Sequence, residues 1–425
     1  MQMIRKPLEN RSGELYFDGI SSKDLANEFD TPLYVISESR IRSNCRRLFK
    51  ALARNYGKVR IYYAMKANSN LSVLKTLESE GAYVDAVSPG EVFLALKAGF
   101  SPERILFTGT SVRNYELEFL VNSKVSVNVD SLSQLDRLLK LTVPALLSVR
   151  VNPEMGSGHH THVVTAGEHS KFGLWETDAL RAFEAAKTAG VERFGIQMHV
   201  GSGVLGFEPF ILALDKLLDV AKKVHNRLGL HFEFVDMGGG LGVPYKPDDL
   251  ELDLTLFADK VLALFRLRTD EYNLGEPFFC LEPGRYLVSD ACVLLTKVNT
   301  VKVTPHKRFA GIDAGFNTLI RPTMYGSYHH IVAANKLDFP ETETYDVVGP
   351  ICESGDALAK DRRLPKLEEG DLLAVLNAGA YGFSMSSQYN SRPRAAEVMV
   401  KEGKAVLVRK REQFSDLLSH QIKEE

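Results

Sequence analysis

The stretch VRIYYAMKANSN, residues 59–70, joins a strand pattern to an isolated cation. Its first seven residues are mostly apolar, β-branched or aromatic, which favours a buried β-strand. Lys66 follows directly, ahead of the small and polar residues Ala67 and Asn68. A lysine at the end of a buried strand is unfavourable unless it is neutral or covalently used, and a lowered pKa would make it a nucleophile. The commoner alternative is a surface lysine with its ammonium in water.

Seven more stretches with the same strand pattern follow along the chain. Together, the eight candidate strands are VRIYYAM, AYVDAV, RILFTG, VSVNVD, ALLSVRVN, FGIQMHV, FEFVDMG and FFCLEPG. The linkers between the first five resemble amphipathic helices, such as NLSVLKTLESEG and PGEVFLALKAGF. Eight strands in alternation with helices predict an α/β fold of the (β/α)8 barrel type.

The pattern changes after about residue 285. The stretches RYLVSDACVLLTKVNTVKV, TYDVVGP, DLLAVLNAG and KAVLVRK are expected to be strands without intervening helices, as are GELYFDG and TPLYVIS near the start. We therefore predict two domains. Residues 40–285 form the barrel, and residues 1–39 with 286–425 form a mostly β domain, a sandwich or barrel built from both termini.

Length and composition limit the class of protein. A chain of 425 residues is too long for one ordinary hydrophobic core. Its 44% hydrophobic and 25% charged residues are typical of a globular protein. The formal net charge of -2 gives no reason to expect nucleic acid. No secretory signal or run of membrane-spanning length is present, so no membrane partner is expected. Four cysteines without CxxC spacing argue against structural zinc and predict a reduced, cytoplasmic enzyme.

Residues with chemical function collect where the predicted strands end, which is where barrel enzymes carry their active sites. They are Lys66, Asp85, Ser88, Arg150, His199, Gly238, Gly239, Gly240, Glu282 and Arg285. The glycine run exposes backbone N–H groups that can approach an anion, usually phosphate. An isolated run of this kind is more often a flexible turn, but its place after the seventh of eight strands favours phosphate.

A nucleophilic lysine beside a phosphate cradle indicates an aldehyde that carries a phosphate, and pyridoxal 5'-phosphate is the obvious candidate. Glu282 would then keep the pyridine nitrogen protonated, which makes the ring an electron sink. His199 could stack on the ring, although a lone histidine is more often a satisfied core residue. Arg285 could be an ion-pair partner of Glu282 or bind substrate.

No metal site is expected. His159, His160 and His162 lie in a glycine-rich segment without a carboxylate at useful spacing. A mobile loop over the site, with the glycines Gly156, Gly158 and Gly167, is the preferred interpretation.

The stretches YYAMKAN, HVGSG, GGGLG and EPGR, in this order, resemble the alanine-racemase-like, type III pyridoxal-phosphate decarboxylases. That family joins a (β/α)8 barrel to a β domain and includes ornithine, arginine and diaminopimelate decarboxylases. The stretches HTHVVTAGEHSKFG, RPTMYGSYHH, GPICESGD and NAGAYGFSMSSQYNSRPRAAEV are similar to the diaminopimelate decarboxylases in particular. The resemblance covers nearly the whole chain.

The resemblance implies a role for each matching residue. Lys66 would form the Schiff base with the cofactor, and Cys352 would be the acid that reprotonates the carbanion. The remaining cofactor ligands would be His199, Ser202, Gly238, Gly239, Gly240, Glu282, Arg285 and Tyr381. Substrate would be bound by Arg285, Arg321, Tyr325, Glu353 and Tyr381. The resemblance also implies a homodimer whose active sites are shared, because the cysteine segment comes from the neighbouring subunit.

The expected reaction is the pyridoxal-phosphate-dependent decarboxylation of meso-2,6-diaminopimelate to L-lysine and carbon dioxide, the last step of lysine biosynthesis. The distal end of this substrate carries a carboxylate and an ammonium. Arg321 can make a bidentate bond to the carboxylate, and Glu353 can take the ammonium. The alternatives for these residues are a surface salt bridge for Arg321, a solvated loop acid for Glu353 and a small buried hydrophobe for Cys352.

Several other functions remain open at this point. A related decarboxylase would act on ornithine, arginine or a carrier-linked amino acid. A racemase would need an acid–base pair on both ring faces and would release no gas. A non-catalytic pyridoxal-phosphate carrier typically consists of the barrel alone. A barrel aldolase with a Schiff-base lysine would leave Glu282 and the β domain unexplained.

Overall fold

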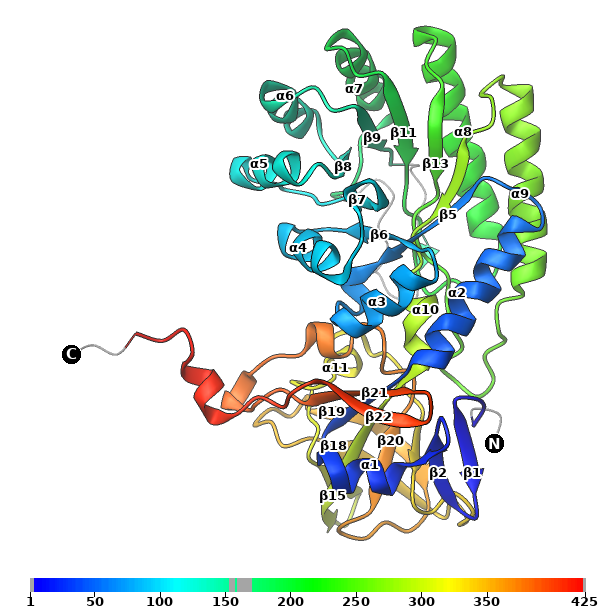
Figure 1. The fold of residues 1–425 in the computed structure, drawn as a ribbon. Helices are drawn as coiled ribbons and strands as arrows, with labels where there is room; N and C mark the ends of the chain where they lie inside the picture. Colours follow the sequence, from blue (N-terminus) through cyan, green and yellow to red (C-terminus); the bar gives the residue numbers. More distant parts are fainter. Residues whose placement is uncertain (1–3, 153–156, 159–169, 423–425) are drawn as a thin grey trace. The chain divides into compact units, whose positions relative to one another are not determined.

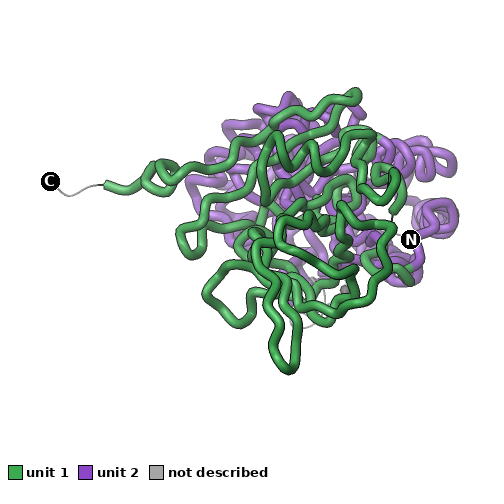
Figure 2. Tube along the Cα trace, turned by 90° about the horizontal axis from the view of Figure 1, so that it is seen from below, with its two compact units in different colours: residues 1–42, 244–249, 288–425 green, residues 43–243, 250–287 purple. Residues whose placement is uncertain are grey.

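The computed structural model describes residues 4–152, 157–158 and 170–422. The chain divides into two compact units, coloured separately in Figure 2. The terminal unit comprises residues 1–42, 244–249 and 288–425, and the barrel unit comprises residues 43–243 and 250–287. The division falls inside helix α2 (Glu38–Ala53).

The barrel unit contains a closed barrel of eight parallel strands in the order β11-β13-β14-β5-β6-β7-β8-β9. The strands are β5 (Val59–Ala64), β6 (Tyr83–Ala86), β7 (Ile105–Phe107), β8 (Ser126–Val129), β9 (Leu146–Arg150), β11 (Arg193–Gln197), β13 (Phe232–Asp236) and β14 (Phe278–Leu281). Pairing of β14 with β5 closes the ring. This confirms the predicted (β/α)8 barrel. Seven of the eight predicted stretches contain a whole strand, and the eighth, FGIQMHV, begins one residue after the start of β11.

Helices connect the strands and lie outside the ring (Figure 1). They are α3 (Leu71–Ser79), α4 (Pro89–Ala98), α5 (Asn114–Ser123), α6 (Leu132–Leu141), α7 (Glu176–Thr188), α8 (Glu208–Leu228) and α9 (Leu254–Glu271), with the short α10 (Arg285–Val288) after β14. Smaller elements are η1 (Met65–Ala67), η2 (Pro102–Arg104), β10 (Ser157–Gly158) and β12 (Gly201–Ser202). In α6, Leu135 and Leu138 are fully buried one helical turn apart, as an amphipathic helix requires.

The interior of the barrel is filled by side chains. Tyr62, Leu106, Phe234 and Cys280 form a buried apolar cluster there. A Cβ at Gly195 would lie 2.2 Å from the Phe234 ring, so glycine at this position makes room for the aromatic side chain. This packed layer forms the floor beneath the polar residues at the carboxyl ends of the strands.

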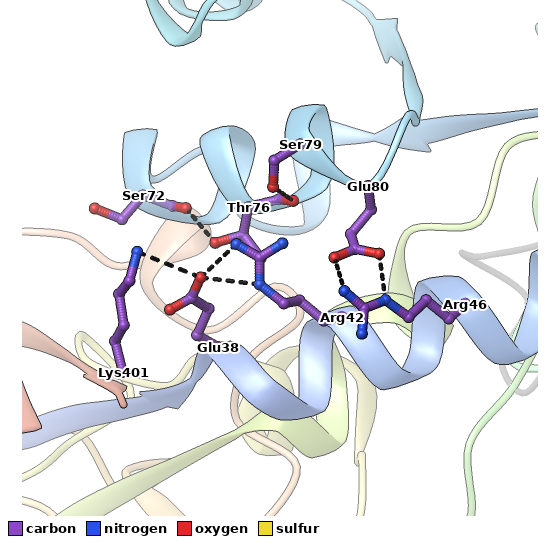
Figure 3. A network of polar contacts seen from close by, with 8 residues as sticks. All are labelled: Glu38, Arg42, Arg46, Ser72, Thr76, Ser79, Glu80 and Lys401. Atoms are coloured by element: carbon purple, nitrogen blue, oxygen red, sulfur yellow. Dashed lines mark hydrogen bonds and ion pairs between the residues drawn. The ribbon is translucent and has the colours of Figure 1, made fainter. Parts of the chain in front are cut away.

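Helix α2 contributes residues to ion pairs in both units, because its first residues belong to the terminal unit and the rest to the barrel unit (Figure 3). In the barrel unit, the guanidinium of Arg46 binds both carboxylate oxygens of Glu80, at 2.6 and 2.7 Å. Because Glu80 directly follows α3, this ion pair connects α2 to the carboxyl end of the helix that follows Lys66 in the sequence. In the terminal unit, Glu38 pairs with Arg42 at 2.5 Å and with Lys401 at 3.6 Å.

The terminal unit is mostly β, as predicted. Its main sheet has nine strands, seven of them in the order β19-β18-β16-β15-β4-β21-β22, and β20 pairs with both β15 and β17. These strands are β4 (Leu33–Ser37), β15 (Cys292–Val303), β16 (Arg308–Ile312), β17 (Ile331–Ala333), β18 (Glu343–Val348), β19 (Ala357–Leu364), β20 (Leu372–Val375), β21 (Ala396–Lys401) and β22 (Lys404–Arg409). Since β4 lies between β15 and β21, both ends of the chain contribute to one sheet.

A smaller sheet and several short helices complete the terminal unit. The small sheet consists of β1 (Leu8–Arg11), β2 (Glu14–Phe17) and β3 (Ile20–Ser21). The helices are α1 (Ser22–Phe29), η4 (Ser289–Ala291), α11 (Arg321–Tyr325), η5 (Phe383–Met385), η6 (Tyr389–Ser391) and η7 (Phe414–Leu418). Leu15, Phe17, Leu33 and Val398 belong to one hydrophobic core, so the small sheet packs on the large one.

One predicted strand was wrong in its first part. The stretch from residue 285 to 303 was expected to be extended throughout, but residues 285–291 form α10 and η4, and β15 starts only at Cys292. The N–H of Leu287 donates to the carbonyl of Gly284, and its own carbonyl accepts from the Asn44 amide. The apolar side chains of this turn are buried, so tertiary packing overrides their β propensity.

None of the helices within the described residues has the length and apolarity that a membrane span requires.

Candidate functional site

Lys66 lies in the turn η1, immediately after β5. Two buried side chains shape this turn: the Tyr63 hydroxyl donates to the carbonyl of Asn68 at 2.8 Å, and Asn70 caps α3. The ammonium Nζ of Lys66 lies 3.1 Å from Oδ2 of Asp85. The Lys66 side chain is 37% exposed and that of Asp85 is 0% exposed, so a partly accessible amine is paired with a buried carboxylate.

The surroundings of Asp85 are acidic as well as basic. The hydroxyl of Thr108, after β7, donates to its other carboxylate oxygen. Glu91 accepts the N–H of Val87 at 2.7 Å, and burial, with a contribution from Asp85, raises the pKa of Glu91 to about 7. Ser88, singled out from the sequence, caps α4 by accepting the N–H of Glu91.

Two more buried carboxylates, Asp236 at the end of β13 and Glu282 after β14, interact with Asp85. Burial and the Asp85 charge raise the pKa of Asp236 to about 8, although the N–H of Gly238 donates to its Oδ1 at 2.8 Å. Among the described residues, its Oδ2 has no hydrogen-bond partner. Burial, then Asp85 and Asp236, raises the pKa of Glu282 well above its usual range. A group that brings positive charge to this place would be strongly favoured.

Two cations face these acids. Lys66 and Arg150, which ends β9, both lower the pKa of Glu282. Burial, then Lys66 and Arg150, lowers the pKa of His199 well below its usual range, so its ring is neutral. The N–H of Gly239 donates to Nδ1 of His199 at 2.9 Å, which places the ring proton on Nε2.

The three glycines after β13 form a tight loop. Gly238 and Gly240 have left-handed backbone conformations, with φ of +70° and +127°. A Cβ at Gly238 would lie 2.2 Å from the carbonyl oxygen of Met198, and one at Gly239 would lie 2.4 Å from that of Glu282. Only glycine allows the chain to pass so close to its neighbours. The N–H groups of Gly238 and Gly239 donate to Asp236 and His199, which leaves Gly240 as the place in this loop where a phosphate group could approach the backbone.

Arg285 begins α10 and is buried. Its Nη2 and Nε donate to the hydroxyl of Ser202 at 3.0 and 3.3 Å. The strand β12, which contains Ser202, pairs with β10, where Gly158 lies opposite Ser202. The predicted loop residues Gly156, Gly167, His159, His160 and His162 lie outside the described residues. Among the described residues, no group of three or more His, Cys, Asp or Glu side chains could hold a metal ion.

Four buried residues around the carboxylates were not found from the sequence. They are Thr108, Asn128, Gln197 and Asp236. Asp236 could have been found, because it is an acid at a strand end, like Asp85. Gln197 precedes His199 by two positions in a strand pattern, which suggests the same face of the strand. The sequence around Asn128 and Thr108 contains no comparable pattern that would have predicted their contacts.

In the terminal unit, Cys352 and Glu353 lie in a loop between β18 and β19. The Cys352 thiol is exposed, and its N–H donates to Oδ1 of Asn390 at 3.0 Å. The hydroxyl of Tyr389 donates to Glu353 at 2.7 Å, and the Tyr389 ring stacks on Phe316 at 5.6 Å. The segment with Tyr389 and Asn390 therefore holds both loop residues.

A buried acid fixes the same loop from its other side. Asp356 accepts the N–H groups of Ile351 and Phe316, both at 2.7 Å. Gly315 and Gly349 lie against its carboxylate, where a Cβ would clash. Burial raises the pKa of Asp356 in spite of these hydrogen bonds.

Arg321, the first residue of α11, is buried in the terminal unit. Its Nη1 lies 3.0 Å from the Tyr245 hydroxyl and 3.0 Å from Nε2 of His329, and its Nη2 donates to Ser327. Nδ1 of His329 lies 2.9 Å from the carbonyl of Leu376, so the ring donates there and accepts from Arg321. These contacts with neutral groups help to fix the position of the guanidinium.

Two tyrosines complete the predicted set. Tyr325 ends α11 and is half-buried, like Tyr381. Tyr381 has a φ of +59°, a left-handed conformation that is rare for a bulky residue and commonest at functional sites. The predicted residues thus form two groups: Lys66, His199, Ser202, the glycine loop, Glu282 and Arg285 in the barrel unit, and Arg321, Tyr325, Cys352, Glu353 and Tyr381 in the terminal unit.

Comparison with known proteins gives consistent results. Residues 39–289 match the family model described as "Pyridoxal-dependent decarboxylase, pyridoxal binding domain". The chain is 55% identical over 414 residues to a protein of Methanothermobacter thermautotrophicus named diaminopimelate decarboxylase, covering 97% of this chain and 96% of that one. A protein of the same name from Archaeoglobus fulgidus is 42% identical and covers 96% of this chain and 97% of its own.

The likeness extends to a solved structure. The structure titled diaminopimelate decarboxylase from M. jannaschii in co-complex with L-lysine superimposes with a TM-score of 0.92. It is 33% identical in sequence and covers 100% of this chain and 99% of that one.

Proposed function

Because the chain belongs to the pyridoxal-dependent decarboxylases, and among them to the diaminopimelate decarboxylases, we propose that it converts meso-2,6-diaminopimelate to L-lysine and carbon dioxide. The observation that carries this proposal is one cluster at the carboxyl ends of the barrel strands. There, a partly accessible Lys66 faces the buried carboxylates Asp85 and Glu282 beside a loop of three glycines.

The barrel unit fits pyridoxal 5'-phosphate. Lys66 supplies the amine for the aldehyde, and the backbone at Gly240 is proposed to approach the phosphate. Gly238 and Gly239 shape the loop, since their N–H groups donate to Asp236 and His199. Glu282 is a carboxylate for the ring nitrogen, whose positive charge would lower its raised pKa. His199, neutral and fixed by Gly239, suits the face of an aromatic ring. Ser202, Arg285 and Tyr381 are proposed to complete the set of cofactor ligands.

The protein groups hold the substrate and move its protons. When bound, the cofactor draws off the electron pair released as the carboxyl group leaves. Asp85, 3.1 Å away, would hold the ammonium of Lys66 whenever this amine is not bonded to the cofactor. The Sγ–H of Cys352 then delivers a proton to the α carbon. This role suits the exposed thiol, because burial raises the pKa of the other three cysteines, Cys45, Cys280 and Cys292.

Recognition of the distal end of the substrate is assigned to residues of the terminal unit. Arg321 is proposed to bind the distal carboxylate, since its position is already fixed by Tyr245, His329 and Ser327. Glu353, oriented by the hydroxyl of Tyr389, would take the distal ammonium. Tyr325 and Arg285 are proposed as further substrate ligands. A decarboxylase of ornithine or free lysine needs no arginine for a distal carboxylate.

The active unit is proposed to be a homodimer that acts in the cytoplasm. The segment with Cys352 would come from the neighbouring subunit, as the family resemblance implies. A cytoplasmic location remains a prediction from the sequence.

The decisive experiment is incubation of the purified protein with pyridoxal phosphate and meso-diaminopimelate, with L-lysine and carbon dioxide both measured. We expect equal amounts of the two products. Ornithine, arginine and L-lysine serve as competing substrates, and faster gas release from any of them would reject the substrate assignment. A change of configuration without gas would indicate a racemase, and bound cofactor without turnover would indicate a carrier.

A further inference from the structure

Glu282 receives its hydrogen bonds from an amide that no sequence motif indicates. Nε2 of Gln197 lies 3.1 Å from both Oε1 and Oε2 of the carboxylate. Gln197 is the last residue of β11 and is 1% exposed, and Glu282 follows β14 and is 3% exposed. Among the described residues, Gln197 is the side chain that donates to this carboxylate. Because both side chains are buried, water has little access to replace the amide as the donor to this carboxylate.

The orientation of the Gln197 amide is itself determined by a second amide. Nδ2 of Asn128, on β8, donates to Oε1 of Gln197 at 3.2 Å, and Asn128 is fully buried. If the Gln197 amide were turned over, its oxygen would face the Glu282 carboxylate and its nitrogen would face the Asn128 donor. Both contacts would then be repulsive, so the Asn128 donor favours the orientation that points the N–H group of Gln197 at Glu282. Among the described residues, Oδ1 of Asn128 has no hydrogen-bond partner.

This arrangement acts together with Lys66 and Arg150, which favour the ionised form of Glu282, and against the forces that favour its protonated form. Burial and the charges of Asp85 and Asp236 all favour the protonated acid. A protonated Glu282 could not hold a proton on the ring nitrogen of the cofactor. A donor fixed 3.1 Å from both oxygens favours the ionised form and holds the plane of the carboxylate.

We propose that Gln197, directed by Asn128, is a positioning residue that keeps Glu282 ionised and aimed at the ring nitrogen of the cofactor. The proposal rests on the proposed function, because it takes Glu282 as the partner of that nitrogen. It goes further by identifying two amide side chains, Gln197 and Asn128, that control the protonation state of Glu282.

Two substitutions, one at each of the two amides, test the proposal. Gln197→Met keeps the length of the side chain and removes the donor. Asn128→Leu leaves Gln197 in place, removes the donor that faces its oxygen and adds no charge, so the orientation of the Gln197 amide is no longer fixed from this side. The control is Ser148→Ala, which removes a buried hydroxyl that has no hydrogen-bond partner among the described residues and whose backbone pairs with Asn128.

The first readout uses the enzyme loaded with nitrogen-15-labelled pyridoxal phosphate. In both test variants, the ring-nitrogen NMR signal is expected to shift toward that of an unprotonated pyridine, and kcat to fall about tenfold or more. KM for meso-diaminopimelate should change much less. Ser148→Ala should match the wild type. Wild-type signal and kcat in both test variants would overturn the proposal.

The second readout needs no cofactor. In the apoprotein, carbon-13 NMR of labelled glutamate, assigned by the signal lost in Glu282→Gln, reports the titration of Glu282. Its pKa is expected to rise further in Gln197→Met and Asn128→Leu, and an unchanged titration in both variants would reject the proposal. If one variant fails to fold, the other decides. If the wild type releases no carbon dioxide, the proposed function fails, while this titration still decides whether the amides keep Glu282 ionised.

Discussion

The ammonium of Lys66 lies 3.1 Å from a carboxylate oxygen of Asp85, whose side chain has no exposed surface. Lys66 lies in the turn that follows β5 and Asp85 lies near the end of β6, and these two strands of the barrel pair side by side. A lysine left in water would need no such partner. The pair holds the amine at the barrel mouth while it is not bonded to another group, and it explains why a cation can follow a strand as buried as residues 61–64.

Lys66→Ala is expected to abolish the visible absorption of bound pyridoxal phosphate and to lower decarboxylation by about 10³-fold or more, because the amine that bonds the aldehyde is gone. Absorption spectra and carbon dioxide release measure the two effects. Lys97→Ala is the control, since Lys97 lies on α4 with its ammonium over the Phe93 ring. A Lys66→Ala protein that keeps its colour and its turnover would rule out the assigned role.

Gly238→Ala should weaken cofactor binding by about tenfold or more. Its φ of +70° disfavours any Cβ by about 1–2 kcal/mol, and here the added atom would also lie 2.2 Å from the carbonyl oxygen of Met198. Gly229→Ala is the matched control, because φ is +65° and no atom lies within 4 Å of the added Cβ.

Equilibrium titration with pyridoxal phosphate gives the affinity of both glycine variants, and thermal unfolding gives their stability. We expect Gly229→Ala to lose some stability and to retain wild-type affinity. Equal affinities for the two variants would show that the close packing of the glycine loop does not matter for the cofactor.

Cys352→Ser should reduce kcat by roughly 10²- to 10⁴-fold, the range for loss of a positioned general acid, because a hydroxyl is a much weaker acid than a thiol. KM should change little. Steady-state kinetics with meso-diaminopimelate measures both constants. Cys292→Ala is the control: that cysteine is buried, and its pKa is raised well above the usual range. A similar loss in both variants would assign the effect to folding rather than to proton delivery.

Asp236→Asn should stabilise the apoprotein at high pH. The pKa of Asp236 is raised to about 8 in the folded protein, so the folded state binds a proton that the unfolded state has already lost. Its contribution to stability is therefore fully present below the unfolded pKa of about 4 and is lost as pH rises toward 8. The asparagine does not titrate, and its oxygen still accepts the N–H of Gly238.

Unfolding midpoints of the apoprotein, compared near pH 6 and above pH 8, test this expectation. The advantage of Asp236→Asn over the wild type should grow with pH across that interval. Asp248→Asn changes the net charge equally at an exposed position and should show no such trend. A constant difference between Asp236→Asn and the wild type would contradict the assigned titration.

Much of the barrel and its mouth follows from local sequence patterns. The eight strands were predicted because the alternation of apolar and β-branched residues depends on neighbours only a few positions away. Lys66, His199 and Glu282 were predicted to share one site because strand ends in a parallel barrel converge on one face. The local pattern failed at residues 285–288, where a β-prone sequence forms α10 and its apolar side chains are buried by distant parts of the chain.

The order of strands and helices and the residue types at the strand ends can be predicted from the amino-acid order alone, since both depend on short-range patterns. Which of those residues meet depends on how the chain folds. Asn128 and Gln197 are 69 positions apart, and Gln197 and Glu282 are 85 apart, yet they form one line of hydrogen bonds. Closure of the barrel sets these distances, and burial sets the pKa of Asp236 and Glu282, because neither effect exists before the chain has folded.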